Sequence, residues 1–162
     1  MRILLVGAGA VGQVYGHYLQ RSGARVDCFV RPRYVSQARA GFKLYRLDPL
    51  EDTVEKQWIA ERVFSERGQL EGQPFDQVWL CVSATSLSDE ELSAFHQCVS
   101  PLATIVSLQP GVHVMDRLRH FFPNRPLVSG LIGMVSYQCP LKGDLQTLPP
   151  GVAYMLAGPR AT

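Results

Sequence analysis

The chain opens with MRILLVGAGAVG, residues 1–12, in which a continuous apolar run of strand type leads into a glycine-rich turn. An amphipathic segment follows the turn, and a second apolar run then ends at Arg31. A Gly-x-Gly-x-x-Gly pattern alone is a weak signal, because three glycines within six residues arise by chance. Its position between a strand and a helix is the context that the motif requires. The opening of the chain therefore predicts a nucleotide-binding βαβ unit.

Each glycine of the turn has a separate expected role. Gly7 permits the tight turn out of the strand, Gly9 lets the backbone approach a pyrophosphate, and Gly12 lets the helix pack closely on the strand. The helix directs its free N–H groups and the positive end of its dipole at the phosphates. Gly16, one turn further on, is expected to extend the smooth helix face toward the sheet. The predicted phosphate-binding residues are Gly7, Ala8, Gly9, Ala10, Val11 and Gly12.

The residue that closes the second strand distinguishes between the two nicotinamide coenzymes. In NAD sites, an Asp or Glu roughly 20 residues beyond the glycines accepts hydrogen bonds from the ribose hydroxyls. Arg31 stands at this spacing, and a guanidinium pairs with a 2′-phosphate that a carboxylate would repel. Asp27 lies in mid-strand, where it is poorly placed for ribose. The pattern favours NADP(H) over NAD(H); the alternative is that Arg31 and Arg33 only solvate a loop.

Composition places the chain among ordinary globular proteins. Its 162 residues have the length of one domain, with 46% hydrophobic and 19% charged residues. The formal net charge of +2 is too small to indicate nucleic-acid or membrane partners, and no segment approaches the roughly 20 apolar residues of a membrane span. The four cysteines show no CxxC pairing and no metal-ligand spacing. We expect reduced thiols in a cytoplasmic protein without a metal site.

Strand and helix patterns continue to alternate beyond the first unit. Ser88 is an expected helix N-cap, with Glu91 as its capping-box partner. Residues 48–55 are expected to form a polar turn or loop, and the glycine- and proline-rich tail to add strands interrupted by turns. Further strands are expected at residues 42–47, 57–64, 77–82 and 103–108, and helices at residues 33–40, from 88 onward and at 112–122. This order predicts an α/β, Rossmann-type fold: a doubly wound, mostly parallel sheet with helices on both faces.

Ligands of an open parallel sheet bind at the carboxyl ends of its strands, near the reversal of strand order. Besides the glycine turn and Arg31, such ends are predicted at residues 82–85 and 108–111. The small residues at 83–86 would let a nicotinamide or ribose approach the backbone, and they fit a simple turn into the next helix equally well. The candidate coenzyme-binding residues at these two ends are Val82, Ser83, Ala84, Gln109 and Pro110.

Taken together, these segments resemble the N-terminal NADP-binding domain of the ketopantoate reductase (2-dehydropantoate 2-reductase) family. The resemblance spans nearly the whole of residues 1–162, which we therefore expect to be a single NADP-binding domain. It implies an NADPH-dependent reductase that converts ketopantoate to pantoate on the route to pantothenate. The segments that carry it are residues 1–12, Arg31, residues 105–112, 127–130, 150–152 and 157–158.

The chain departs from the family pattern at two positions. Where the family has a lysine in a short Val-Lys-Ala motif that helps to hold the coenzyme, this chain has Ser83. Where the family has an Asn-Gly pair, with the asparagine against nicotinamide and substrate, this chain has Pro110. Proline offers neither an amide side chain nor a backbone N–H. These departures put ketopantoate itself in doubt as the substrate.

The resemblance also implies a second, mostly helical domain that supplies the catalytic lysine and a substrate-binding carboxylate and mediates dimerisation. We expect this domain to be absent from the chain. Hydride reduction of a ketone needs a donor for the developing alkoxide, and none of Lys43, Lys56 and Lys142 falls at a predicted strand end beside the glycine turn. His113 is the one internal candidate for an acid, with helix capping as the alternative. No catalytic residue is therefore predicted in this chain.

Three functional hypotheses remain open. In the first, the chain is the coenzyme-binding part of an NADP-dependent reductase and takes a small 2-oxo acid only together with the second domain. In the second, it is a non-catalytic nucleotide-sensing or partner-binding module that has kept the fold. In the third, it belongs to a two-domain dehydrogenase of the 6-phosphogluconate or opine type. An exposed apolar patch is expected between residues 131 and 156, and with it a homodimer or higher species.

Overall fold

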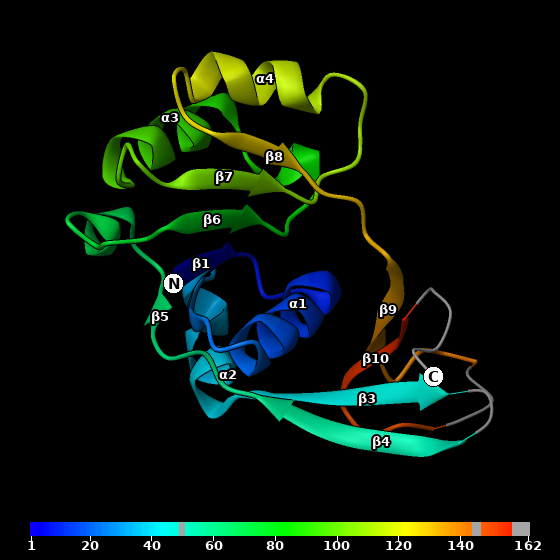
Figure 1. Cartoon of the computed structure of the whole chain (residues 1–162). Helices are drawn as coiled ribbons and strands as arrows, with labels where there is room; N and C mark the ends of the chain where they lie inside the picture. The colour runs from blue at the N-terminus through cyan, green and yellow to red at the C-terminus, as the bar shows by residue number, and fades with distance from the viewer. Residues whose placement is uncertain (49–50, 144–146, 157–162) are drawn as a thin grey trace.

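A parallel six-stranded sheet forms the centre of the computed structural model, which describes residues 1–48, 51–143 and 147–156 (Figure 1). Its strand order is β5-β2-β1-β6-β7-β8, and every neighbouring pair is parallel. The chain builds outward from β1 to one edge and then from β6 to the other, which confirms the predicted doubly wound α/β fold. The strands are β1 (Arg2–Val6), β2 (Arg25–Phe29), β5 (Val63–Phe64), β6 (Gln77–Leu80), β7 (Thr104–Ser107) and β8 (Leu127–Ser129).

Helices cover both faces of this sheet, because its central strand is apolar on both sides. Successive side chains of a strand point to opposite faces, so Ile3 and Leu5 belong to one core cluster and Leu4 and Val6 to the other. The first cluster includes residues of α1 (Ala10–Arg21) and α2 (Val35–Ala40), and the second includes residues of α3 (Asp89–Cys98) and α4 (Val114–Phe121). Figure 1 shows these two pairs of helices on opposite sides of the sheet.

The predicted helix ends are confirmed. Helix α1 is capped at Ser22, and Gly23 follows with a φ of 91°, a left-handed conformation that glycine adopts readily. At the start of α3, the Ser88 hydroxyl accepts a hydrogen bond from the Glu91 N–H (3.2 Å), and the Glu91 carboxylate accepts one from the Ser88 N–H (2.7 Å). Among the described residues, no helix combines the length and the apolar character needed to cross a membrane.

A second sheet of four strands packs over α1, on the side away from the parallel sheet. Its order is β4-β3-β10-β9, with β10 parallel to β3 and antiparallel to β9. Gly16 of α1 faces this second sheet: a Cβ added there would lie 2.5 Å from Cε2 of Trp58. The expectation that Gly16 meets the parallel sheet is therefore wrong. The strands are β3 (Phe42–Asp48), β4 (Glu51–Trp58), β9 (Met134–Cys139) and β10 (Gly151–Leu156).

The predicted polar turn over residues 48–55 is wrong at residue 48, which ends β3, and at residues 51–55, which belong to β4. Strand β4 begins at Glu51 and pairs antiparallel with β3, Tyr45 lying opposite Glu55 and Phe42 opposite Trp58. Because β4 is an edge strand, its pairing with β3 comes from the backbone, and the polar side chains of Thr53, Glu55 and Gln57 remain exposed. The mostly polar sequence of β4 therefore gives no signal from which this strand could be predicted. The expected strand at residues 57–64 is split between the end of β4 and β5. Residues 49–50 and 157–158 lie outside the described residues.

Candidate functional site

A cleft of about 470 Å³ opens at the carboxyl ends of β1, β2 and β6. Strand order reverses between β1 and β6, so the cleft lies where open α/β sheets bind ligands. Its walls are the glycine turn, the end of β2 with the following helices, the loop after β6 with the start of α3, and two residues of the second sheet. The lining residues are Val6, Gly7, Ala8, Gly9, Gln13, Phe29, Val30, Arg31, Tyr34, Gln37, Phe42, Val82, Ser86, Leu87, Glu91, Phe95 and Gln138.

The glycine turn is tightly packed at Gly7 and Gly12 and has open space at Gly9. Gly7 has a φ of 95°, its N–H donates to the Phe29 carbonyl at 3.0 Å, and a Cβ there would collide with Val82. A Cβ at Gly12 would collide with the Gly7 carbonyl oxygen, so the helix can leave the turn only with glycine at this position. A Cβ at Gly9 would meet nothing within 4 Å. The backbone at Gly9 is therefore accessible to a ligand.

Helix α1 begins at this turn with its N-terminal N–H groups uncapped by any side chain. Its N-cap is Gly9, and its first turn contains no acidic residue. Unpaired N–H groups and the helix dipole together favour an anion at this end. Gln13, which lines the cleft, donates from Nε2 to the Ala8 carbonyl at 2.8 Å and so supports the glycine turn at the start of α1. Sequence reasoning missed Gln13, because nothing in the pattern marks a lone glutamine on a helix.

Arg31 follows β2 and carries an exposed side chain that lines the cleft. Among the described residues, no hydrogen bond or ion pair to its guanidinium is found. Arg33, by contrast, lies with its guanidinium 4.8 Å over the Tyr34 ring. The free Arg31 cation is available to an anionic ligand in the cleft.

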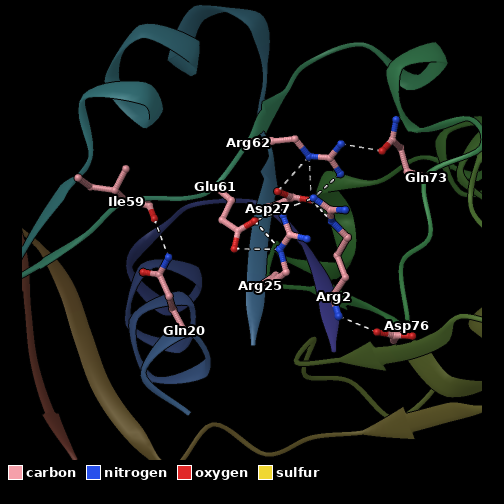
Figure 2. A network of polar contacts seen from close by, with 9 residues as sticks. All are labelled: Arg2, Gln20, Arg25, Asp27, Ile59, Glu61, Arg62, Gln73 and Asp76. Carbon is pink, nitrogen blue, oxygen red and sulfur yellow. Dashed lines mark hydrogen bonds and ion pairs between the residues drawn. The ribbon is translucent and has the colours of Figure 1, made fainter. Parts of the chain in front are cut away.

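Asp27, the carboxylate of β2, lies away from the cleft. Its side chain is fully buried and pairs with Arg2 at 3.0 Å and with Arg62 at 2.8 Å. Figure 2 shows Asp27 between these two guanidinium groups. The prediction that Asp27 is poorly placed for ribose is therefore confirmed.

The loop after β6 supplies one wall of the cleft. Val82, Ser86 and Leu87 line the cleft. Residues 84–86 form a single turn of 3₁₀ helix that leads toward α3. The Ser83 hydroxyl is hydrogen-bonded to the hydroxyls of Thr85 (3.3 Å) and Ser86 (2.5 Å). The reading of residues 83–86 as a turn into the next helix is confirmed. Ser86 also lines the cleft, and the approach of a nicotinamide or ribose to this backbone stays a prediction.

The loop after β7 does not reach the cleft directly. Gln109 is buried, and its Nε2 donates to the Ser83 carbonyl at 3.2 Å, while Pro110 is exposed. The structure thus brings part of the predicted set together around the cleft. The predicted residues that line it are Gly7, Ala8, Gly9, Arg31 and Val82; those that do not are Ala10, Val11, Gly12, Ser83, Ala84, Gln109 and Pro110.

The histidine and lysine considered from the sequence as proton donors, His113 and Lys43, lie outside the cleft. His113 stands at the N-cap of α4 without a side-chain capping bond, and Lys43 of β3 pairs with Glu55 at 3.1 Å. No lysine or histidine occurs among the described residues that line the cleft. Within the described part of the chain, no group of three or more His, Cys, Asp or Glu residues could hold a metal ion.

The family model of ketopantoate reductase PanE/ApbA matches residues 3–144. The chain belongs to this family. None of the curated proteins with which it was compared matches it.

Solved structures share this fold. They include 2-dehydropantoate 2-reductase from Methylococcus capsulatus (TM-score 0.72, 23% identity, covering 98% of this chain and 46% of that one). A PanE/ApbA family ketopantoate reductase from Ralstonia eutropha JMP134 has a TM-score of 0.67 and 26% identity, covering 98% and 47%. Octopine dehydrogenase, solved with NADH and agmatine, has a TM-score of 0.73 at 13% identity, covering 98% and 40%. This ketopantoate reductase family chain therefore spans about half the length of these relatives.

Proposed function

We propose that the chain binds NADP(H) in the cleft and forms the coenzyme-binding part of an NADPH-dependent reductase of a 2-oxo acid such as ketopantoate. One observation carries the proposal: the unpaired guanidinium of Arg31 shares a cleft with the open backbone of Gly9 at the uncapped start of α1. A dinucleotide with a 2′-phosphate has an anion for each of these two places.

The choice between the two coenzymes rests on Arg31 and Asp27. A carboxylate that binds the ribose of NAD must face the cleft, and Asp27 is instead buried between Arg2 and Arg62. Glu91 is the one carboxylate among the described lining residues, and its Oε2 is taken by the Ser88 N–H. Octopine dehydrogenase, which shares this fold, was solved with NADH, so the preference for NADP(H) rests on the residues of the cleft and not on the fold. The free guanidinium of Arg31 therefore supports NADP(H).

The reaction needs more than the described cleft contains. Bound NADPH would supply the hydride for a ketone, and a lysine, histidine or tyrosine must stabilise the alkoxide that develops. Tyr34 is the only such residue among the described lining residues, and it lies next to Arg31, at the adenosine end of the proposed site. We therefore propose that catalytic groups come from a second domain of the family and that the chain alone binds coenzyme without turnover.

The test is a fluorescence titration with NADPH and NADH, using the wild type, Arg31→Ala and the control Arg39→Ala. Arg39 is an exposed arginine of α2 that does not line the cleft. Loss of the Arg31–phosphate pair should weaken NADPH binding by about 1–3 kcal/mol. Binding of NADH, and both affinities of Arg39→Ala, should stay close to wild type. Absence of binding of either coenzyme refutes the proposal, and an equal loss for NADPH and NADH refutes the role of Arg31.

A non-catalytic nucleotide-sensing module is the second candidate, favoured by the loop geometry. Ser83 stands where the family has a lysine, and its hydroxyl is occupied by Thr85 and Ser86. Pro110 stands where the family has an asparagine, and it offers no side-chain amide. Oxidation of NADPH by ketopantoate, measured on a polypeptide that contains both domains, separates the candidates. Turnover supports the reductase, whereas coenzyme binding without turnover supports the sensing module.

The apolar surface around β9 and β10 supports the proposal of a homodimer. Leu131 is 93% exposed and Val135 67%, and Met155 and Leu156 are also exposed. Contiguous exposed apolar side chains drive self-association. Light scattering of the chain at rising concentration should show a dimer or larger species, and a monodisperse monomer at high concentration contradicts this.

A further inference from the structure

Arg117 of α4 binds the backbone of the loop that walls the cleft after β6. Its guanidinium donates to the Ala84 carbonyl at 3.0 Å and to the Leu87 carbonyl at 2.8 Å. The same group pairs with Asp89, at the start of α3, at 2.6 Å. One side chain thus holds both ends of the 84–87 segment and the first residue of the following helix.

The backbone of residues 83–87 makes few other hydrogen bonds. Apart from its hydroxyl cluster, it makes one short-range backbone bond, from the Ser86 N–H to the Ser83 carbonyl at 2.9 Å. Gln109 adds a bond to that same carbonyl from the segment after β7. The Leu87 side chain is buried in the core beside Leu92 and Phe95, which holds that side chain but not the backbone of residues 84–86. Hydrogen bonds from a charged guanidinium are stronger than neutral ones, so Arg117 is the strongest polar constraint on the backbone of this loop.

We propose that Arg117 is a positioning residue for the coenzyme, holding Ser86 and Leu87 in place against its adenosine half. The inference rests on the proposed function. Arg31 would bind the 2′-phosphate on the adenosine ribose, and Ser86 and Leu87 line the same cleft from the loop after β6. The adenosine half would then lie between these two walls. A wall that is already ordered costs less entropy to bind against than one that must be ordered by the ligand.

The chain contains a matched control for this chemistry. Like Arg117, Arg125 donates to backbone carbonyls, in its case those of Ser100 (2.6 Å), His96 (2.7 Å) and Val99 (2.9 Å). These lie at the C-terminal end of α3, and neither Arg125 nor any of the three lines the cleft. Arg125 therefore stabilises the fold in the same way as Arg117 but without contact with the proposed site.

The experiment measures dissociation constants for NADPH and for adenosine 2′,5′-bisphosphate, which is the adenosine half with its 2′-phosphate. The proteins are the wild type, Arg117→Met, Arg117→Lys and Arg125→Met, each held well below its own unfolding midpoint. Arg117→Met should weaken both ligands by about tenfold. Arg117→Lys, which keeps the charge but loses the planar fork, should lie between. Arg125→Met should lower Tm and leave both affinities within about twofold of wild type.

Four outcomes overturn the inference. The first is a fall in Tm for Arg117→Met with unchanged affinities for both ligands. The second is a loss of affinity for Arg125→Met as large as that for Arg117→Met. A loss for NADPH that is not shared by adenosine 2′,5′-bisphosphate also overturns it. If Arg117→Met does not fold, unchanged affinities of Arg117→Lys and of Asp89→Asn, which removes the charge that orients Arg117, overturn it instead. Failure of the wild type to bind either ligand refutes the proposed function as well, so the two failures are distinguishable.

Discussion

Replacement of Asp27 by asparagine should destabilise the chain without changing its choice of coenzyme. Asp27 is fully buried on β2, and its carboxylate accepts hydrogen bonds from Arg2 (3.0 Å) and from two nitrogens of Arg62, the shorter at 2.8 Å. Arg62 reaches on to Gln73, and Arg2 also donates its backbone N–H to Asp76 (Figure 2). The carboxylate therefore joins the start of β1 to β2 and to the segment before β5.

The magnitude follows from burial. Removing one partner of a buried ion pair costs about 3–5 kcal/mol, because the remaining charge is left without compensation. Here the side chains of Arg2 and Arg62 are 17% and 35% exposed, so water partly compensates them, and asparagine keeps one acceptor oxygen. We therefore expect a loss of about 2–3 kcal/mol. For a domain of this size that corresponds to a fall in Tm of roughly 4–12 °C.

Urea unfolding, followed by the fluorescence of Trp58 and Trp79, measures this loss as a lower midpoint with an unchanged m-value. The control is Glu55→Gln, which breaks the pair with Lys43 (3.1 Å). That pair is more exposed, so its loss should leave the urea midpoint close to that of the wild type. The ratio of NADPH to NADH affinity should be the same in Asp27→Asn as in the wild type. A change in stability below about 0.5 kcal/mol, or a shift in that ratio, would refute the structural role assigned to Asp27.

Three further predictions concern the core. Gly16→Ala should lower the free energy of unfolding by about 1–2 kcal/mol, since the new Cβ meets the Trp58 indole, whereas Gly68→Ala, with open space around it, should change it by less than about 0.5 kcal/mol; equal effects in urea titrations contradict the packing. Burial lowers the pKa of His17 below 6.5, so the unfolded chain takes up a proton first, and stability should fall as the pH drops below about 6.5. This fall should be smaller in His17→Gln, and identical pH profiles of the unfolding free energy would exclude His17 as its source. Burial raises the pKa of the Cys28 thiol to about 12, so a thiol reagent at about pH 8 should label it only after denaturation; a label on Cys28 in the native protein, located by mass spectrometry, contradicts this.

Local chemistry explains why the first βαβ unit and the capping box at Ser88 could be predicted. A strand with Leu4 and Leu5 on opposite faces must be buried on both sides, and such strands occur in parallel sheets covered by helices. The glycine turn and the Ser88 hydroxyl interact with residues that lie only a few positions away in the sequence. Arg31 lies just after β2, which ends at Phe29, so its position at the cleft also follows from its place in the sequence.

The second sheet could not be predicted in the same way. Strand β4 is held by backbone pairing to β3, and its sequence, EDTVEKQW, is mostly polar and shows no alternation of polar and apolar residues. Gly16 was assigned to the wrong surface because Trp58, its actual neighbour, is far along the chain. Gln138 of β9 lines the cleft because the second sheet packs over α1, and this contact too joins residues that are far apart in the sequence.

The sequence by itself determined the doubly wound fold, the glycine turn at residues 7–12 and the cation at Arg31, because each depends on neighbours along the chain. Only the tertiary structure decided what holds these parts in register. Asp27 proved to be an internal counter-ion rather than a ligand for ribose, and Arg117 proved to bind the loop opposite Arg31. Contacts of this kind join residues from separate elements, and their geometry exists only after the two sheets and the helices have packed together.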